Sequence, residues 1–203
     1  MVLYASPVGE SDKRLVLLTK ELGKITVFAN GARRPKSSFL AAANPFATGR
    51  FSLAAGRNAY TLRKAEIKEY FRELSSDLST LSYGSYFLEL ASCVSQENLS
   101  GTQELTLLYY SLKALLSENF TNTLVRRVFE MKTFVIDGEY PEYSRMKLSE
   151  TAAYTFSFIV NAELKGLYSF RVEESVVEEM GRVLDDYIRR NIPRDFTSLK
   201  LLD

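Results

Sequence analysis

The hydrophobic pattern changes its period near residue 70, and this change constrains the fold more than any other feature of the chain. Before residue 70, apolar residues occur in short runs rich in β-branched and aromatic residues, and glycines separate the runs. After it, apolar residues recur at spacings of three and four. The 203 residues, 46% of them hydrophobic, are enough to bury a core in each part. We therefore predict an α+β protein with a β-rich domain at residues 1–70 and a helical domain at residues 71–203.

Five strands are expected in the first domain. They are VLYA near the start, RLVLLT from Arg14, KITVFA from Lys24, RFSLAA from Arg50 and AYTLRKAEI from Ala59. The turns and bulges between them are assigned to Gly9, Gly23, Gly31, Gly49 and Gly56. The longest gap, residues 32–48, follows the third strand and has room for a helical turn before Pro45. Three strands, a connection and two strands is the order of the five-stranded oligonucleotide-binding (OB) β-barrel, so we predict a small closed barrel of that type.

Five helices are expected after residue 70, and together they predict a helical bundle. The apolar face of the first helix is assigned to Leu74, Leu78, Leu81, Ser85 and Leu88, and that of the second to Leu105, Leu108, Leu112 and Leu115. Asn122 is expected to cap the third helix and Gly138 to end it. Ser149 is expected to cap the fourth helix, ETAAYTFSFIV. The fifth helix is expected from about Glu173 to Ile192, where Pro193 stops it.

Charge is divided unevenly between the two domains, although the net charge of the chain is only +1. Residues 1–70 contain twelve Lys and Arg against five Asp and Glu, and the remainder contains fourteen against twenty. A local positive field attracts polyanions even when the whole molecule is nearly neutral. The β-rich domain is therefore the candidate nucleic-acid-binding part.

Residue types needed for most enzymatic and metal sites are missing. The chain has no histidine, which is the commonest general base and the commonest nitrogen ligand of metals. It lacks the glycine motifs of dinucleotide-binding, P-loop and nucleophile-elbow proteins. Its one cysteine, Cys93, lies among apolar residues and is expected to be a buried thiol. We therefore predict that the protein is not an enzyme and has no metal site and no cofactor.

The apolar runs are also too short for a membrane span. The longest, such as RLVLL and FSFIV, fall far short of the roughly 18 residues that a bilayer requires. The start of the sequence does not resemble a signal peptide. A cytoplasmic location without membrane association is the corresponding expectation.

Residues 30–38, NGARRPKSS, place three cations and no acid in an expected loop. One interpretation is a solvated turn that Gly31 bends and Pro35 fixes. The other is a phosphate-binding arm, which further cations in the expected barrel favour. The candidate nucleic-acid-binding residues are Arg33, Arg34, Lys36, Lys13, Arg14, Arg57, Arg63 and Lys64, with Arg50 beside them. The candidate stacking rings are Phe39, Phe51 and Tyr60, although aromatic residues at strand positions usually belong to a core.

These segments resemble, in sequence and order, the RecO family of bacterial recombination and repair proteins. The similarity lies in GESDKRLVLLTKELGKITVFANGARRPKSSF, NPF, GRNAYTLRKAEI, FRELSSDL and YGSYFLEL, continues through RRVFEMK, and ends in YIRRNIPRDFTSLKLL. It implies an N-terminal OB barrel joined to a helical domain. It also implies a non-enzymatic role in the RecF pathway, in the bacterial cytoplasm at the nucleoid. That role is to bind single- and double-stranded DNA, to anneal complementary strands, and to act with RecR in loading recombinase onto DNA coated by single-strand binding protein.

The sequence departs from the family pattern in two places. Members from similar bacteria usually carry a four-cysteine zinc module after a segment like DGEYPE, whereas here YSRMKLSE joins the flanking pieces directly near residues 143–147. The module is either lost from the chain or omitted from the sequence. The first strand of the family normally starts several residues before a segment like MVLYA, so the start is expected to be clipped.

The resemblance further implies that the helical domain binds the acidic, apolar C-terminal tail of single-strand binding protein. Such a tail requires an apolar groove rimmed by cations. The candidate partner-binding residues are Arg126 and Lys132. Because of the helical turn, at most two cations of the third helix can lie on the same rim. For Arg127, a buried ion pair with Glu130 is an equally good interpretation. The next candidates for the tail are Arg182, Arg189 and Arg190.

Two other functions stay open beside that of a DNA-binding mediator. In the first, the protein is an adaptor whose helical domain holds partner proteins and whose basic domain does not bind DNA. In the second, the barrel binds RNA and contacts its 2′-hydroxyl groups. Salt-dependent binding of single strands separates the adaptor from the other two, and competition between DNA and RNA separates those.

Overall fold

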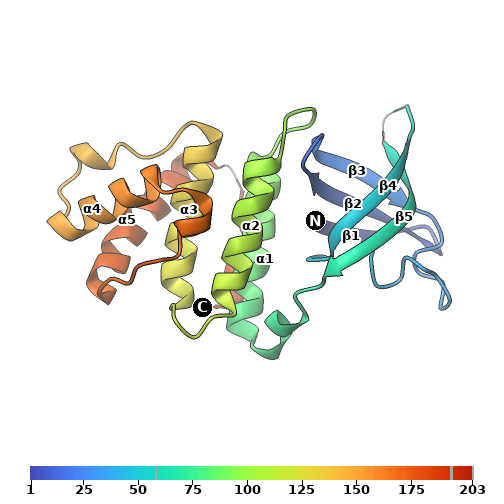
Figure 1. Cartoon of the computed structure of the whole chain (residues 1–203), viewed down its shortest axis with the longest axis horizontal. Coiled ribbons are helices and arrows are strands. Elements are labelled where there is room, and N and C mark those ends of the chain that lie inside the picture. Colours follow the sequence, from blue (N-terminus) through green and yellow to red (C-terminus); the bar gives the residue numbers. More distant parts are fainter. Residues whose placement is uncertain (58, 193, 203) are drawn as a thin grey trace. The chain divides into compact units, whose positions relative to one another are not determined.

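The computed structural model describes residues 1–57, 59–192 and 194–202, and the chain divides into two compact units. The sheet unit consists of Met1–Arg72 and Ser95–Leu105, and the helical unit consists of Glu73–Val94 and Thr106–Asp203. Figure 1 shows the strands in the first unit and the long helices in the second. The chain is thus an α+β protein, as the change of period near residue 70 predicts. The return of residues 95–105 to the sheet unit has no counterpart in the sequence-based division.

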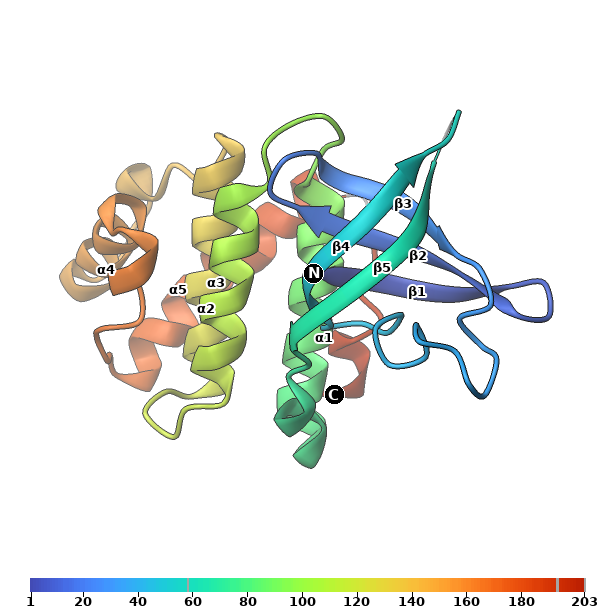
Figure 2. The same cartoon turned by 45° about the vertical axis from the view of Figure 1, so that its right-hand side comes forward.

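The sheet unit contains all five predicted strands. They are β1 (Val2–Val8), β2 (Asp12–Thr19), β3 (Gly23–Ala29), β4 (Thr48–Ala55) and β5 (Tyr60–Glu69). The order in the sheet is β1-β2-β3-β5-β4, in which β3 and β5 run parallel and the other neighbours run antiparallel. Figure 2 shows the hairpin of β4 and β5 crossing the three-stranded part. The sheet is therefore OB-like in the number of its strands and in the place of its long connection.

The barrel is not closed, which corrects the expectation of a closed one. Within the described residues, no strand ladder joins the two edge strands, β1 and β4. At the edge of β1 away from β2, backbone hydrogen bonds join Val2 to the residues just before β4: Val2 N donates to Ala47 O at 2.9 Å, and Phe46 N donates to Val2 O at 3.0 Å. The connection between β3 and β4 also places Ala32 and Ala43 in the core of the sheet. Packing of this connection therefore takes the place of strand pairing along most of that edge.

The core of the sheet unit lies on one face of the sheet. The register aligns Ala5, Leu15, Val27 and Tyr60 in one row across β1, β2, β3 and β5. Leu15 and Val27 are fully buried, and Ala5 and Tyr60 pack against them. Because successive residues of a strand point to opposite faces, the residues between these form the outer face.

The segment Ser95–Leu105 joins the sheet unit at the β2–β3 turn. Lys24 N donates to Gln96 O at 3.0 Å, and Asn98 N donates to Leu22 O at 3.0 Å. Gly23 permits this approach, because a Cβ at residue 23 would lie 2.1 Å from Gln96 O. Its φ of +62° is also one that glycine adopts readily.

The helical unit contains five α-helices, one of which starts in the sheet unit, together with short 3₁₀ segments. The α-helices are α1 (Leu78–Val94), α2 (Thr102–Leu115), α3 (Asn122–Asp137), α4 (Glu150–Asn161) and α5 (Glu174–Asn191). The 3₁₀ segments are η1 (Arg72–Ser76), η2 (Tyr143–Arg145), η3 (Leu164–Gly166) and η4 (Leu199–Leu201). None of the helices, within the described ranges, is both long and apolar enough to cross a membrane.

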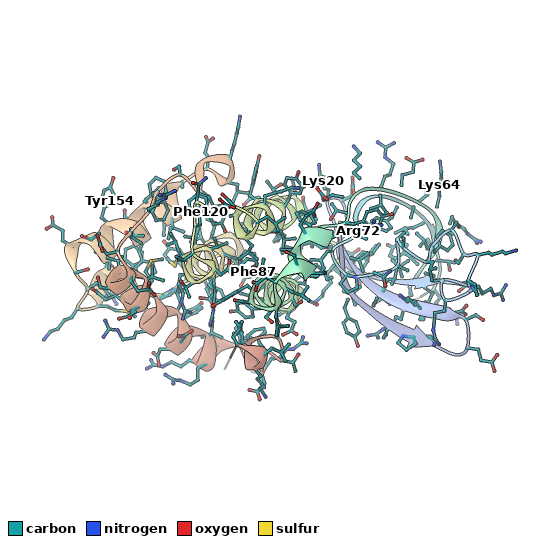
Figure 3. The ribbon with its side chains drawn as sticks, turned by 90° about the horizontal axis from the view of Figure 1, so that it is seen from below. Lys20, Lys64, Arg72, Phe87, Phe120 and Tyr154 are labelled. Atoms are coloured by element: carbon teal, nitrogen blue, oxygen red, sulfur yellow. The ribbon has the colours of Figure 1, made fainter. Side chains whose placement is uncertain are left out.

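The buried face of α1 matches the predicted leucine face only in part: Leu88 is buried, as is Leu74 in η1. Leu78 is 64% exposed, whereas Tyr86, Phe87 and Leu90 are fully buried. The ring of Phe87 stacks on that of Phe129 from α3, with 4.2 Å between centroids; Figure 3 shows Phe87 among the helices. The prediction is wrong for Leu78 because the large aromatic side chains bury more area and select the packed face.

The helix ends agree with the sequence except at the start of α3. Ser149 caps α4 by accepting a hydrogen bond from Ala152 N, and Gly138 ends α3 with φ of +96°. The cap of α3 is Thr121, whose Oγ1 accepts from Leu124 N, and not Asn122. Asn122 lies in the first turn, and its side chain donates to Thr80 of α1. The fifth helix ends at Asn191, and Pro193, its predicted stop, lies outside the described residues.

Candidate nucleic-acid interface

The basic loop, residues 30–38, is fixed against the turn between β1 and β2. Gly31, with φ of +68°, donates its N–H to Asp12 Oδ1 at 2.7 Å. Arg33 N donates to Ser11 O at 2.8 Å, and Arg33 Nη1 donates to Gly9 O at 3.1 Å. Two parts of the chain that are about 20 residues apart thus form one end of the sheet unit.

The cations of this loop face solvent. Arg33, Arg34 and Lys36 are all exposed, and Pro35 lies exposed between them. No acid occurs in the loop. In the turn that anchors it, Asp12 accepts a backbone N–H and Glu10 is exposed to solvent. An exposed group of cations on an anchored backbone can contact phosphates with less loss of conformational entropy than a flexible loop.

Lys13 has a different position from the one predicted for a phosphate ligand. Its Nζ donates to Ala43 O and to Asn44 Oδ1, each at 2.8 Å, so it ties β2 to the connection before β4. Burial, and then the positive charge of Arg33, lower the pKa of Lys13. The ammonium is therefore engaged within the fold, and its charge acts beside that of Arg33.

Arg14 lies on the outer face of the sheet. It is exposed, and the register places it opposite Ser6 on β1 and Phe28 on β3. Its side chain lies on the face opposite to that of Lys13, because neighbouring residues of a strand point to opposite faces.

A second group of cations lies on the hairpin of β4 and β5. Arg50 pairs in register with Glu66, and the carboxylate of Glu66 forms an ion pair with Lys64. The hydrogen bond and the charge of Lys64, followed by the charges of Arg50 and Lys68, lower the pKa of Glu66. Figure 3 shows Lys64 extending outward from the hairpin.

The remaining two predicted residues belong to the same hairpin. Arg63 is exposed at the point in β5 where the register with β4 shifts, and Arg57 is exposed near the tip of the hairpin. The predicted residues thus form two groups, one at the basic loop and β2 and one on the β4–β5 hairpin. In the sheet, β2 and β4 are separated by β3 and β5.

The predicted stacking rings belong to the core. Phe39, Phe51 and Tyr60 are partly buried and pack against the core of the sheet unit. The exposed aromatic residue of the sheet is instead Tyr4 on β1, which is 51% exposed. Neither charge nor a leucine-type pattern marks Tyr4. Strict alternation from the buried Val2 would place Tyr4 on the core face, and the register shift between Val2 and Tyr4 turns its side chain outward instead.

Lys132 does not lie on an exposed rim, which corrects the expectation that it faces a partner. It is 6% exposed, and its Nζ donates to Ile159 O, Val160 O and Ala162 O at 3.0, 3.0 and 2.7 Å. These carbonyls belong to the C-terminal end of α4, where a cation complements the helix dipole. Burial lowers the pKa of Lys132. Its charge therefore stabilises the packing of α3 on α4.

Arg126 also has partners within the helical unit. Its Nε donates to Glu130 Oε1 at 2.8 Å, and its Nη2 donates to Asp185 Oδ1 at 3.1 Å. The guanidinium lies over the ring of Tyr86, 5.1 Å from its centroid. Arg127 binds Glu130 as well, which confirms the buried ion pair proposed for that residue. Both arginines are thus mostly buried connectors between α3 and its neighbours.

Comparison with known protein families covers both units. Residues 1–71 match the family described as "Recombination protein O N terminal", and residues 75–145 and 142–200 match "Recombination protein O C terminal". The chain belongs to the RecO family. The two pieces of the second match overlap at residues 142–145.

Relatives within the RecO family extend over most of this chain. The DNA repair protein RecO of Acetivibrio thermocellus is 27% identical over 235 residues, with 100% of this chain and 94% of the relative covered. The DNA repair protein RecO of Alkaliphilus metalliredigens is 33% identical over 183 residues, covering 87% of this chain and 74% of the relative. The DNA repair protein RecO of Desulforudis audaxviator is 38% identical over 142 residues, covering 70% of this chain and 56% of the relative. Membership of this family identifies the chain as a DNA repair and recombination protein.

Proposed function

We propose that the protein is a DNA-binding recombination mediator. It binds single- and double-stranded DNA through the sheet unit, anneals complementary strands, and acts in the RecF pathway with RecR and single-strand binding protein to load recombinase. The observation that carries this proposal is the basic loop, whose exposed Arg33, Arg34 and Lys36 are anchored to the β1–β2 turn of an OB-like sheet. The action is non-catalytic and takes place at the bacterial nucleoid in the cytoplasm.

The sheet unit is proposed to act as an OB barrel in spite of its open seam. The strand order supports this, and so does the backbone pairing of Val2 with Phe46 and Ala47, which brings β1 to the start of β4. In OB folds, the loop between the first two strands and the loop between the last two flank the bound strand. Here the basic loop lies at the first of these, and Arg57 lies at the second.

A labelled single-stranded DNA titrated with the protein at several salt concentrations tests the proposal. Because bound cations displace counterions from phosphates, the affinity is expected to fall steeply as salt rises. Unlabelled DNA is expected to displace the label better than RNA of the same sequence. No binding at low salt would support the adaptor function instead, and stronger competition by RNA would support the RNA-binding function.

For the tail of single-strand binding protein, we propose a site at the C-terminal end of α5. Arg189 and Arg190 are exposed there, and Arg182 is exposed nearer the middle of the helix. Arg126 and Lys132 instead bind groups within the helical unit. Arg189 and Arg190 both pair with Asp186, but their side chains remain 75% and 74% exposed, so water screens these pairs. An acidic tail can therefore compete for both guanidinium groups.

A tail peptide titrated into the Arg189→Ala/Arg190→Ala variant tests this site. The affinity of the variant for the peptide is expected to be at least several-fold lower than that of the unmodified protein. Arg145→Ala is the matched control, because Arg145 is equally exposed and pairs with Glu142. Equal affinities of all three proteins would place the tail elsewhere.

A further inference from the structure

The outer face of β1, β2 and β3 presents two aromatic rings with an arginine between their strands. The register aligns Ser6, Arg14 and Phe28 in one row across the three strands, and Tyr4 leads the next row with Val16 and Thr26. On one face of a sheet, directly opposite and diagonal residues are neighbours. Arg14 is therefore opposite Phe28 and diagonal to Tyr4.

Burial confirms that these three side chains share the face opposite to the core. Leu15 and Val27, which flank Arg14 and Phe28 in the sequence, are fully buried. Arg14 is exposed and Phe28 is partly buried, whereas Tyr4 is 51% exposed. A large ring held half in water on a strand leaves apolar area that a flat ligand can cover.

Arg14 is also the free charge of this face. Neither its guanidinium nor the Tyr4 hydroxyl forms a hydrogen bond or an ion pair with any residue in the described ranges. By contrast, Lys13 on the other face is engaged with Ala43 and Asn44. A free arginine beside two aromatic rings matches a ligand that has both π-faces and negative charge.

Tyr4 lies on the strand that ends at the turn to which the basic loop is anchored. From Tyr4, β1 runs to Val8 and then to Gly9, whose carbonyl accepts the hydrogen bond of Arg33. At about 3.3 Å per residue, Tyr4 lies roughly 17 Å from this turn along the strand. A single nucleic-acid strand is long enough to contact both places with one continuous backbone.

We infer that Tyr4 and Phe28 form a stacking platform for unpaired bases of single-stranded DNA, with Arg14 contacting the backbone phosphate between them. This inference rests on the proposed DNA-binding function and adds to it the part of the ligand that the outer face recognises. Bases in a duplex are already stacked and paired, so their π-faces are closed to the two rings. The platform therefore gives the protein a preference for single strands, whereas the cations of the basic loop bind both kinds of DNA.

The absence of tryptophan from the chain permits a direct test. In Tyr4→Trp, the new indole is the only tryptophan, and a single-stranded oligonucleotide is expected to quench its fluorescence as bases stack on it. Tyr154→Trp is the matched control, because Tyr154 is 72% exposed on α4 of the helical unit; Figure 3 shows it at the periphery. Duplex DNA is expected to quench neither reporter. If single strands bind the Tyr4→Trp protein without changing its indole fluorescence, the platform is overturned.

Affinity measurements complete the test. Tyr4→Leu keeps an apolar side chain without the ring and is expected to weaken single-strand binding by about 5- to 150-fold, the range of one lost base stack. Tyr4→Phe keeps the ring and is expected to bind normally. Duplex binding and the salt dependence should stay unchanged in both, because stacking releases no counterions.

An oligonucleotide without bases separates the two proposals. It is expected to bind the unmodified protein and Tyr4→Leu equally, because phosphate contacts alone remain. If the unmodified protein binds no single strand at all, the proposed function fails and the platform fails with it. If it binds normal strands with steep salt dependence but Tyr4→Leu binds them equally well, only the platform is overturned.

Discussion

Arg127 on α3 donates two hydrogen bonds to Asp185 on α5, from Nη1 to Oδ1 at 2.6 Å and from Nη2 to Oδ2 at 2.9 Å. Its Nη1 also donates to Glu130 Oε2 at 2.9 Å. The side chain of Glu130 is fully buried, and its other oxygen accepts from Tyr86 and from Arg126. Burial alone lowers the pKa of Arg127, but the charges of Glu130 and Asp185 raise it above its ordinary value. The network thus compensates a buried carboxylate with two arginines.

Replacement of Arg127 by Met is expected to lower the free energy of unfolding by about 3–5 kcal/mol, because it leaves the charge of Glu130 buried with one arginine fewer. Urea denaturation measures the change. Arg145→Met is the control: Arg145 pairs with Glu142 on the surface, where removal of an ion pair costs less than about 1 kcal/mol. Equal stability of the two variants would contradict a structural role for Arg127.

The N-terminal cap of α1 is expected to weaken in acid. Thr80 Oγ1 and Thr80 N both donate to Asp77 Oδ2 at 2.7 Å, and these hydrogen bonds lower the pKa of Asp77 below its usual 3.8. A carboxylate with a lowered pKa in the folded state stabilises the fold above the unfolded pKa, and this contribution is lost as the pH falls through the folded pKa. Asp77→Asn can still cap the helix but does not titrate.

Thermal unfolding from pH 7 to pH 2 measures the contribution of Asp77. Native protein is expected to melt above Asp77→Asn at neutral pH, and the gap between their melting temperatures should shrink as the pH falls below 3.8. A gap that stays constant over this range would show that the charge of Asp77 has no part in the cap.

Replacement of Gly49 is expected to destabilise the β4–β5 hairpin. A Cβ at residue 49 would lie 2.1 Å from Glu66 O, so the two strands would have to move apart. Gly49→Ala is therefore expected to lower the free energy of unfolding by about 1–3 kcal/mol. The control is Gly166→Ala, for which no atom lies within 4 Å of the added Cβ, with an expected change within about 0.5 kcal/mol. An equal effect of both substitutions would mean that β4 and β5 do not pair as described.

The strands and most helix ends could be predicted from the sequence because they depend on local patterns. Alternation and glycines identify β1 to β5, and the cap and stop residues Ser149 and Gly138 act within one turn of their helices. The open seam could not be predicted. It depends on how the connection before β4 packs its small residues, such as Ala43, into the core.

The candidate site was predictable as a charge pattern but not as a set of contacts. Arg34 and Lys36 are exposed as expected. Lys13 and Lys132 instead donate to carbonyl groups about 30 residues away in the sequence, and no local pattern identifies such partners. Tyr4 was missed because its exposure depends on an irregular register between Val2 and Tyr4 at the start of β1.

The central claim, that the basic loop binds DNA phosphates, is tested most directly by the salt dependence of single-strand binding in Arg33→Ala/Arg34→Ala/Lys36→Ala. Because this variant removes three cations that each neutralise a phosphate, the slope of log K against log salt is expected to flatten by roughly 2 to 3 units. The matched control, Arg145→Ala/Lys147→Ala/Lys165→Ala, removes three exposed cations of the helical unit and should keep the native slope. Circular dichroism is the check that both variants are folded. A triple loop variant that is folded and keeps the native slope would contradict the claim and leave residues 30–38 as a solvated turn.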